Sequence, residues 1–153
     1  MSGFGKVLAF ALVLDHDRRR RNHDEFCERI NGNIQRWEEQ IRRNEEAQTR
    51  VDSNLTRNLE RLSKSRLFLE RMNSSATREW LERNERNARE HSKEEVRQAA
   101  ATKVREHYTK LADAEQQYAK TQTWVEEGKT KLRELKNWEY DLHSKISSAR
   151  SKL

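Results

Sequence analysis

Histidine and cysteine side chains that could bind a metal lie close together in one short part of the chain. His23 and Cys27 are four residues apart, which places both on one face of a helix, and His16 and Asp24 are nearby. Nothing else in the sequence completes a four-ligand site. Cys27 also falls at an apolar position of the helical repeat described below, where a free thiol packs as a small hydrophobic group. We therefore interpret Cys27 as a packing residue and predict no metal ion and no cofactor.

Acidic, serine and histidine side chains are numerous, but their spacing does not match a catalytic pattern. No Glu-x-x-His sequence, which is typical of dinuclear metal sites in helical bundles, lies on either long helix predicted below. The sequence Gly3-Phe4-Gly5-Lys6 lacks the preceding strand, the spacing and the Ser or Thr of a phosphate-binding loop. With 33% hydrophobic and 38% charged residues, the chain cannot fill a wide core around a deep pocket. The sequence predicts a protein that is not an enzyme and has no small-molecule substrate.

The first 21 residues differ in composition from the rest and combine an apolar stretch with a basic cluster. They contain five basic and two acidic residues, and therefore half of the net charge of +6. A hydrocarbon surface next to arginines is the combination that attaches helices to anionic lipid. A short helix or strand that packs on this protein or docks on a partner would have the same apolar run. The residues predicted to contact a partner are Phe4, Val7, Leu8, Phe10, Leu12 and Leu14, and the basic cluster is Arg18, Arg19, Arg20 and Arg21.

The apolar run at residues 7–14 is too short to cross a membrane, and no signal-peptide cleavage site follows it. Its eight residues would extend about 12 Å as a helix, whereas the hydrocarbon core of a bilayer is about 30 Å thick. The acidic residues Asp15 and Asp17 follow the run, where a cleavage site would need small residues. The single cysteine favours a reducing compartment. We expect an intracellular, cytoplasmic protein, which associates with a membrane only if the N-terminal segment attaches it.

A repeat of mainly apolar residues, spaced alternately three and four apart, predicts long α-helices through most of the chain. We call the positions of this repeat the seam positions. No proline interrupts them. Ten of the 15 seam positions in the first helix are apolar, as are 12 of the 16 in the last helix. Those of the first helix are His23, Cys27, Ile30, Ile34, Trp37, Ile41, Asn44, Gln48, Val51, Leu55, Asn58, Leu62, Ser65, Leu69 and Met72. Those of the last helix are Ala100, Val104, His107, Leu111, Ala114, Tyr118, Thr121, Val125, Gly128, Leu132, Leu135, Glu139, Leu142, Ile146, Ala149 and Leu153.

Capping signals divide residues 22–153 into three predicted helices. Asn22 has the side chain of an N-cap and predicts a helix start just after it. The polar run at residues 73–75 predicts a break, because these side chains compete for backbone hydrogen bonds. Ser92 and Glu95 have the spacing of a capping box. The predicted helices therefore span about 23–72, 76–91 and 93–153, after a separate docking or anchor segment at 1–21.

The predicted fold is all-α, an elongated antiparallel helical hairpin or coiled coil with a short charged connecting helix. Pairing positions whose numbers sum to about 173 matches both seams almost end to end and places Ile41 beside Leu132. In this register residues 76–91 cap one end of the hairpin, and residues 1–21 project past its other end. A shift by whole heptads also keeps the seams aligned. A parallel dimer of extended helices is the alternative, because heptads do not encode direction.

Three functional hypotheses follow from these features. Trp124 and Trp138 lie beside the seam of the last helix, where they either cover the hairpin seam or contact another molecule. The first hypothesis is a non-catalytic structural or assembly protein that forms a homo-oligomer or binds a partner protein. The second is a peripheral membrane adaptor anchored by residues 4–21. The third is association with nucleic acid through the arginine cluster, which is disfavoured because residues 22–153 carry nearly equal numbers of basic and acidic groups.

Overall fold

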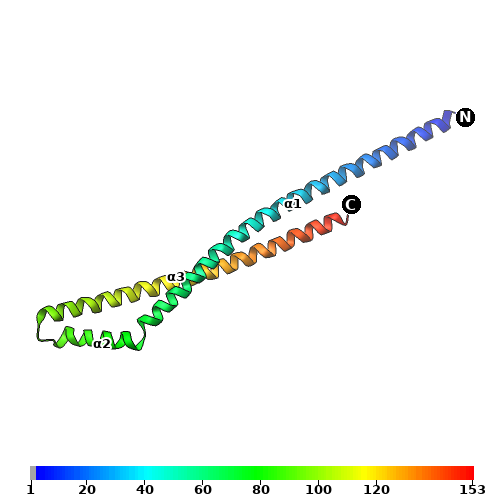
Figure 1. Cartoon of the computed structure of the whole chain (residues 1–153). Coiled ribbons are helices and arrows are strands. Elements are labelled where there is room, and N and C mark those ends of the chain that lie inside the picture. The colour runs from blue at the N-terminus through cyan, green and yellow to red at the C-terminus, as the bar shows by residue number, and fades with distance from the viewer. Residues whose placement is uncertain (1–2) are drawn as a thin grey trace. The chain divides into compact units, whose positions relative to one another are not determined.

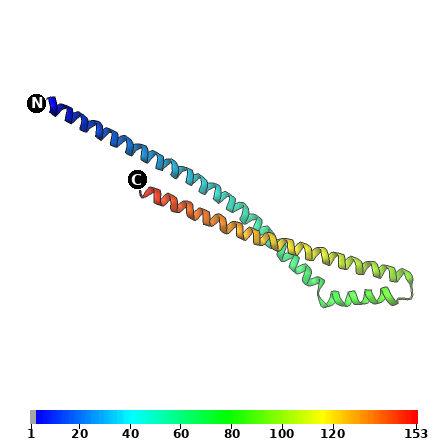
Figure 2. The same ribbon diagram turned by 180° about the vertical axis from the view of Figure 1, so that it is seen from behind.

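Three α-helices make up the computed structural model, which describes residues 3–153 and the side chains from residue 6 onward (Figure 1). Helix α1 spans Gly3–Met72, α2 spans Ser75–Glu90 and α3 spans Glu94–Arg150. Residues 3–153 contain no strand. Helices α1 and α3 run in opposite directions and pack against each other, as both views show (Figures 1 and 2). The predicted all-α class and helical hairpin are confirmed.

The seam positions are the positions that the two long helices bury. Fourteen of the 15 in α1 are buried or half-buried, and His23 is the exposed one. Fifteen of the 16 predicted for the last helix are also buried or half-buried, and only Leu153 is exposed. Most of the remaining side chains on both helices are exposed. A contact stripe of two positions in every seven residues is typical of a coiled coil.

Helix α1 begins at Gly3, far before the predicted start near residue 23. Asn22 therefore lies inside the helix, and the prediction that it caps the helix is wrong. Alanine, leucine, arginine and lysine, which all favour helix, make up ten of the 19 residues at 3–21. Extending an existing helix also avoids the cost of nucleation. A residue that can serve as an N-cap marks the start of a helix only where the residues before it are not themselves helical.

The break between α1 and α2 lies at the predicted polar run. Ser74 is the N-cap of α2, with extended backbone (φ −68°, ψ 158°), and its Oγ accepts a hydrogen bond from the Thr77 amide at 3.3 Å. The Asn73 side chain donates a hydrogen bond to the Leu69 carbonyl at 3.0 Å, in addition to the one that the same carbonyl accepts from the Asn73 amide, in the last turn of α1. Hydrogen bonds of this kind, between polar side chains and the backbone, compete with the hydrogen bonds of a helix. This competition was the reason for predicting a break at residues 73–75.

Replacing Ser74 by alanine is expected to lower the free energy of unfolding by about 1 kcal/mol, because the Thr77 amide loses its acceptor. Thermal unfolding followed by circular dichroism measures the change. Ser75→Ala is the matched control, because Ser75 is exposed and is the first residue of α2. Alanine at that position is expected to be neutral or slightly stabilising. Equal destabilisation by both substitutions would contradict the capping role of Ser74.

A loop of three residues, 91–93, joins α2 to α3. The Nδ1 atom of His91 accepts a hydrogen bond from the Lys93 amide at 3.0 Å. The Arg97 guanidinium, on the first turns of α3, donates a hydrogen bond to the His91 carbonyl at 2.6 Å. These contacts close the loop and orient α3 relative to α2.

The start of α3 differs by one residue from the predicted capping box of Ser92 and Glu95. The first helical residue is Glu94, and the carbonyl of Lys93 before it accepts a hydrogen bond from the Arg97 amide. Lys93 is therefore the capping residue. Glu95 stands at the second helical position instead of the third, so the predicted box is wrong.

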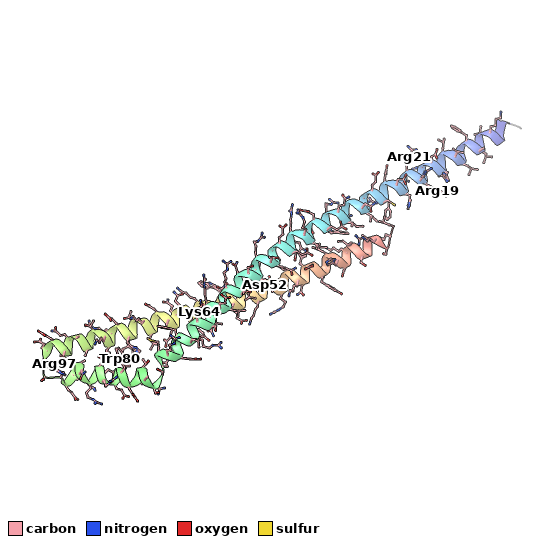
Figure 3. All side chains as sticks on the ribbon, in the orientation of Figure 1. Arg19, Arg21, Asp52, Lys64, Trp80 and Arg97 are labelled. Atoms are coloured by element: carbon pink, nitrogen blue, oxygen red, sulfur yellow. The ribbon has the colours of Figure 1, made fainter. Side chains whose placement is uncertain are left out.

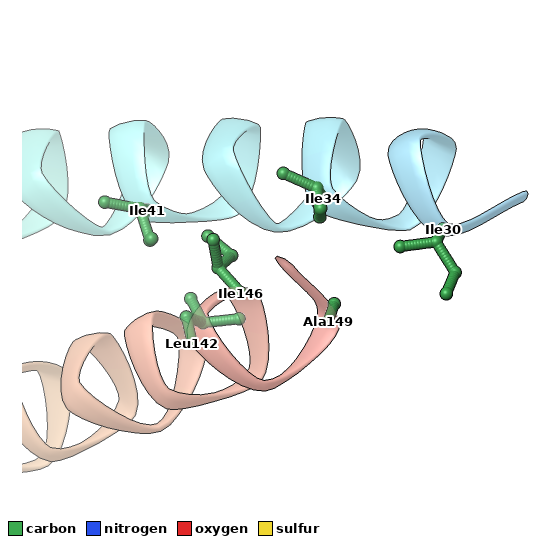
Figure 4. Packing of buried hydrophobic residues seen from close by; sticks show 6 residues of the cluster. All are labelled: Ile30, Ile34, Ile41, Leu142, Ile146 and Ala149. Atoms are coloured by element: carbon green, nitrogen blue, oxygen red, sulfur yellow. The ribbon is translucent and has the colours of Figure 1, made fainter. Parts of the chain in front are cut away.

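The chain forms two compact units, of which the first comprises residues up to Thr49 together with Glu134–Leu153. Its core is a cluster of buried aliphatic side chains between α1 and α3 (Figure 4). Leu142 is the most buried of them, with 1% of its surface exposed. Phe26 and Trp37 are half-buried against the cluster. The core residues are Ile30, Ile34 and Ile41 from α1, and Leu142, Ile146 and Ala149 from α3.

The second unit, Arg50–Arg133, contains α2 packed alongside the beginning of α3. The ring of Trp80 lies 5.9 Å from the ring of His107, and the Tyr108 hydroxyl donates a hydrogen bond to Glu85 at 3.0 Å. Residues 76–91 therefore form part of one arm of the hairpin, and the predicted cap at its end is wrong. A loop of three residues makes consecutive helices antiparallel neighbours.

The register in the first unit differs from the predicted one. The Asn44 side chain donates a hydrogen bond to the Leu135 carbonyl at 2.9 Å. Ile41 lies beside Ile146, not beside Leu132 as predicted. The numbers of these pairs sum to 179 and 187, whereas the prediction was a sum of about 173.

Two physical reasons explain this difference in register. A turn at residues 91–93 pairs positions whose numbers sum to about 184, and the contact of Leu55 with Gly128 in the second unit agrees with it. In addition, two helices that run in opposite directions match only when a three-residue step of one seam faces a three-residue step of the other. Ile41 opposite Leu132 places a three-residue step opposite a four-residue step.

Candidate docking site

The N-terminal part of α1 has no neighbouring helix in the first unit. Every side chain from residue 6 to residue 25 is exposed, and the buried core begins only at Ile30. Ile30 belongs to the same cluster as Ala149, which lies next to the end of α3 at Arg150 (Figure 4). Figures 1 and 2 show α1 continuing beyond the C-terminal end of the chain. The predicted site residues at the N-terminus are therefore presented on a bare helix.

Residues 7–14, which we call the apolar tip, expose large side chains on all sides of α1. Phe10 and Leu12 are 67% and 66% exposed and, at about 100° per residue, lie about 200° apart around the helix axis. The side chain of Phe4, which belongs to the predicted set, lies outside the described side chains. Val13 was missing from the predicted set, although the apolar run contains it. The exposed large side chains of the tip are Val7, Leu8, Phe10, Leu12, Val13 and Leu14.

The four arginines at residues 18–21, which we call the arginine collar, follow the apolar tip. Because consecutive helical residues are about 100° apart, four of them surround the helix axis. Arg19 and Arg21, on opposite sides of the helix by this spacing, are labelled in Figure 3. The Arg19 guanidinium lies 3.0 Å from the Asp15 carboxylate, and both side chains are exposed, so the pair adds little stability. The collar is a ring of positive charge accessible from every side.

His23 and Cys27 lie just after the collar. The Cys27 thiol is free and half-buried, and its Sγ atom lies 3.6 Å from His23 Nε2. Within the part of the chain that the structure describes, no three His, Cys, Asp or Glu side chains come together. The half-buried thiol agrees with the interpretation of Cys27 as a packing residue.

The two tryptophans predicted as partner contacts lie in different units. Trp138 belongs to the first unit and is 45% exposed, and Trp124 belongs to the second and is 43% exposed. Leu59, also in the second unit, is 43% exposed. These three side chains lie beside the contact between the two helices and are partly exposed to solvent. Each unit therefore has an exposed apolar flank.

The first unit contains a layer of hydrogen-bonded polar side chains. The sequence showed these residues only as seam positions that are not apolar and did not predict that they contact one another. Asn44 is 1% exposed, and its Oδ1 accepts a hydrogen bond from Gln48 at 2.5 Å. Gln48 also donates a hydrogen bond to the Glu139 carboxylate across the hairpin. His143 Nε2 lies 3.6 Å from Glu139 Oε1. Each buried polar group of this layer is satisfied, which limits its energetic cost.

Two side-chain pairs with altered pKa values lie outside the candidate site. The hydrogen bond from Arg42 lowers the pKa of the exposed Glu39 carboxyl below its ordinary value. The hydrogen bond that Tyr108 donates to Glu85 raises the pKa of the Tyr108 phenol. Glu39 lines a shallow groove on one face of α1, and the Tyr108 side chain is exposed, so both shifts reflect surface hydrogen bonds.

Shallow grooves between neighbouring side chains occur on the part of the surface that the structure describes. One is lined by Trp37, Ser148 and Lys152, and another follows a single face of α1 at Gly32. Among the described residues, no helix has a stretch long and apolar enough to span a bilayer. Comparison of this chain with models of protein families, with curated proteins and with solved structures found no match.

Proposed function

We propose that this chain is a non-catalytic helical-hairpin protein that acts by docking, with the apolar tip of α1 as its docking element. The observation that carries the proposal is the exposure of the tip, whose large side chains are 51–69% exposed on a part of α1 that packs against no other helix. A helix that is apolar on all sides is normally covered by other atoms. Contiguous exposed apolar surface of this kind marks interaction sites.

The hairpin itself supports the role of a scaffold that presents this element. Nearly all of its seam positions are buried or half-buried within the one chain, so the two arms pack on each other. Helix α1 continues from the core to the tip without a break. The tip is therefore attached to the first unit through a continuous helix rather than through a flexible linker.

The buried polar side chains support a structural role for the hairpin interior. Asn44, His107 and Thr121 are the buried polar residues of the described chain, and each occupies a seam position. The Thr121 hydroxyl donates to a carbonyl of its own helix, and His107 packs against the rings of Trp80 and Tyr108. These contacts account for the polar groups as packing and hydrogen bonding, and the proposal assigns no catalytic residue.

The proposal is tested by a polarity-sensitive fluorophore at the tip of the full chain. Cys27 is replaced by alanine, and a new cysteine is labelled either at Phe10→Cys in the tip or at Leu67→Cys, which is 51% exposed on α1 and serves as control. Emission is followed as the chain concentration rises and as lipid vesicles are added. We expect a blue shift at position 10 in at least one series and none at position 67. Unchanged emission at both positions in both series would refute docking through the tip.

A further inference from the structure

We propose that the apolar tip inserts end-on into one leaflet of an anionic lipid bilayer, with the arginine collar at the headgroups. This inference rests on the proposed docking function and names its partner. Two features of the site carry it: the tip is apolar around its whole circumference, and the charges are separated from it along the helix axis rather than across it.

The distribution of the tip side chains fits a surrounding medium better than a groove. A helix bound in a protein groove presents anchors on one face, at spacings of three, four and seven residues. Phe10 and Leu12 are both about two-thirds exposed on opposite sides of α1, so a groove would leave one of them in water. Hydrocarbon chains surround an inserted helix and cover both.

A second copy of this chain fits the tip less well than lipid does. Continuing the alternating spacing of the α1 seam toward the N-terminus places three polar or charged residues, Lys6, His16 and Arg20, at seam positions on either side of the tip, together with Ala9 and Val13 inside it. Pairing of two tips as a continued coiled coil would bury these polar and charged groups between the helices. Of the six large apolar side chains of the tip, only Val13 lies at a seam position, so pairing along the seam would leave most of the tip uncovered.

The length of the tip matches one leaflet. Eight helical residues extend about 12 Å, and half of a hydrocarbon core of about 30 Å is about 15 Å. The arginine collar begins four residues after the end of the tip at Leu14. An end-on tip therefore places the collar at the level of the headgroups.

The charge around the axis complements an anionic surface that lies perpendicular to the helix. Four exposed arginines spaced about 100° apart can each reach a different headgroup. Asp15 and Asp17 reduce the charge of this region, and Arg19 is paired with Asp15. End-on insertion carries Lys6, which precedes the tip, toward the middle of the bilayer, where a charge is most costly, and the six large apolar side chains of the tip must outweigh this cost.

The first test places the fluorophore on opposite sides of the tip in the full chain. Phe10→Cys and Leu12→Cys are labelled separately in the Cys27→Ala background and mixed with vesicles of equimolar phosphatidylserine and phosphatidylcholine. End-on insertion is expected to shift the emission of both labels to the blue. A shift at only one of them indicates a helix lying in a groove or in the plane of the surface, and overturns the end-on geometry.

The second test removes the positive charge of the collar. Changing all four arginines to glutamine is expected to weaken partitioning into the anionic vesicles several hundred-fold, because each basic residue near an anionic surface contributes about fivefold. The matched control makes the same charge change on the hairpin. It carries Arg61→Gln, Arg66→Gln, Arg105→Gln and Arg133→Gln, all at exposed positions. Equal losses in both variants would overturn the role assigned to the collar.

The two proposals fail in different ways. An emission shift at position 10 that appears with rising chain concentration, but not with vesicles, overturns the lipid inference and keeps the docking function. A shift with phosphatidylcholine vesicles alone that equals the shift with anionic vesicles also overturns the inference, because the collar would then contribute nothing. The absence of a shift in every series refutes both proposals.

Discussion

Replacing Leu142 by alanine is expected to lower the free energy of unfolding by about 2–5 kcal/mol. Leu142 is 1% exposed and lies among the isoleucines of α1 in the core of the first unit (Figure 4). The substitution removes buried methyl groups and leaves a cavity that two rigid helices cannot close fully. Urea unfolding followed by far-ultraviolet circular dichroism measures the loss.

Tyr140 provides a control two residues from Leu142 on the same helix. It is 73% exposed, so Tyr140→Ala is expected to change the free energy of unfolding by no more than about 0.5 kcal/mol. If Leu142→Ala were as mild as the control, α3 would not present this face to α1, and the arrangement of the first unit would be wrong.

Replacing Asn22 by proline is expected to interrupt α1 between the hairpin and the arginine collar. Inside a helix, proline removes a backbone hydrogen bond and clashes with the preceding turn, at a cost of about 3 kcal/mol or more. The N-terminal part of α1 has no packing contacts that could compensate. Amide hydrogen exchange and backbone chemical shifts of residues 6–21 are expected to become those of a largely unfolded segment.

Two comparisons make the proline test specific to a continuous helix. Asn22→Ala is expected to preserve or slightly increase helix content, because alanine favours the helix interior more than asparagine does. If the helix started near residue 23, proline at 22 would stand next to its first turn and would be tolerated. Unchanged chemical shifts at residues 6–21 after the proline substitution would therefore contradict a continuous α1 and support a helix that starts near residue 23.

The sequence predicted the contacts of the hairpin better than its register. The seam positions could be predicted because burial in a two-helix contact leaves a direct periodic record, from Cys27 to Met72 and from Ala100 to Ala149. The register depends instead on which break forms the tight turn. Residues 73–75 have the stronger polar signal, yet the hairpin reverses at 91–93, where hydrogen bonds from Lys93 and Arg97 to His91 close the loop. Such contacts between specific side chains and backbone leave no periodic pattern.

The candidate site was predicted in its residues but not in its form. The apolar run and the arginine cluster are local features of the sequence, and both are exposed in the structure. Their arrangement around one axis follows only from the helical conformation of residues 3–21, which the sequence left open between helix and strand, and the predicted cap at Asn22 separated them from the long helix that they in fact continue. The absence of a neighbouring helix depends on where α3 ends relative to α1, and therefore on the register.

The polar layer of Asn44, Gln48 and Glu139 makes slipped alignments of the two arms unfavourable. In the observed alignment the carboxylate of Glu139 meets the amide of Gln48, and Asn44 bonds across to the opposite backbone. Sliding α3 by seven residues would bring Leu132 or Ile146 to the place of Glu139 and leave the half-buried amide of Gln48 without its acceptor on the opposite helix. The apolar layers tolerate such a slip, since one aliphatic side chain replaces another, whereas this layer does not. A single hydrophilic step in an otherwise repetitive contact thus selects one alignment from several of similar apolar content.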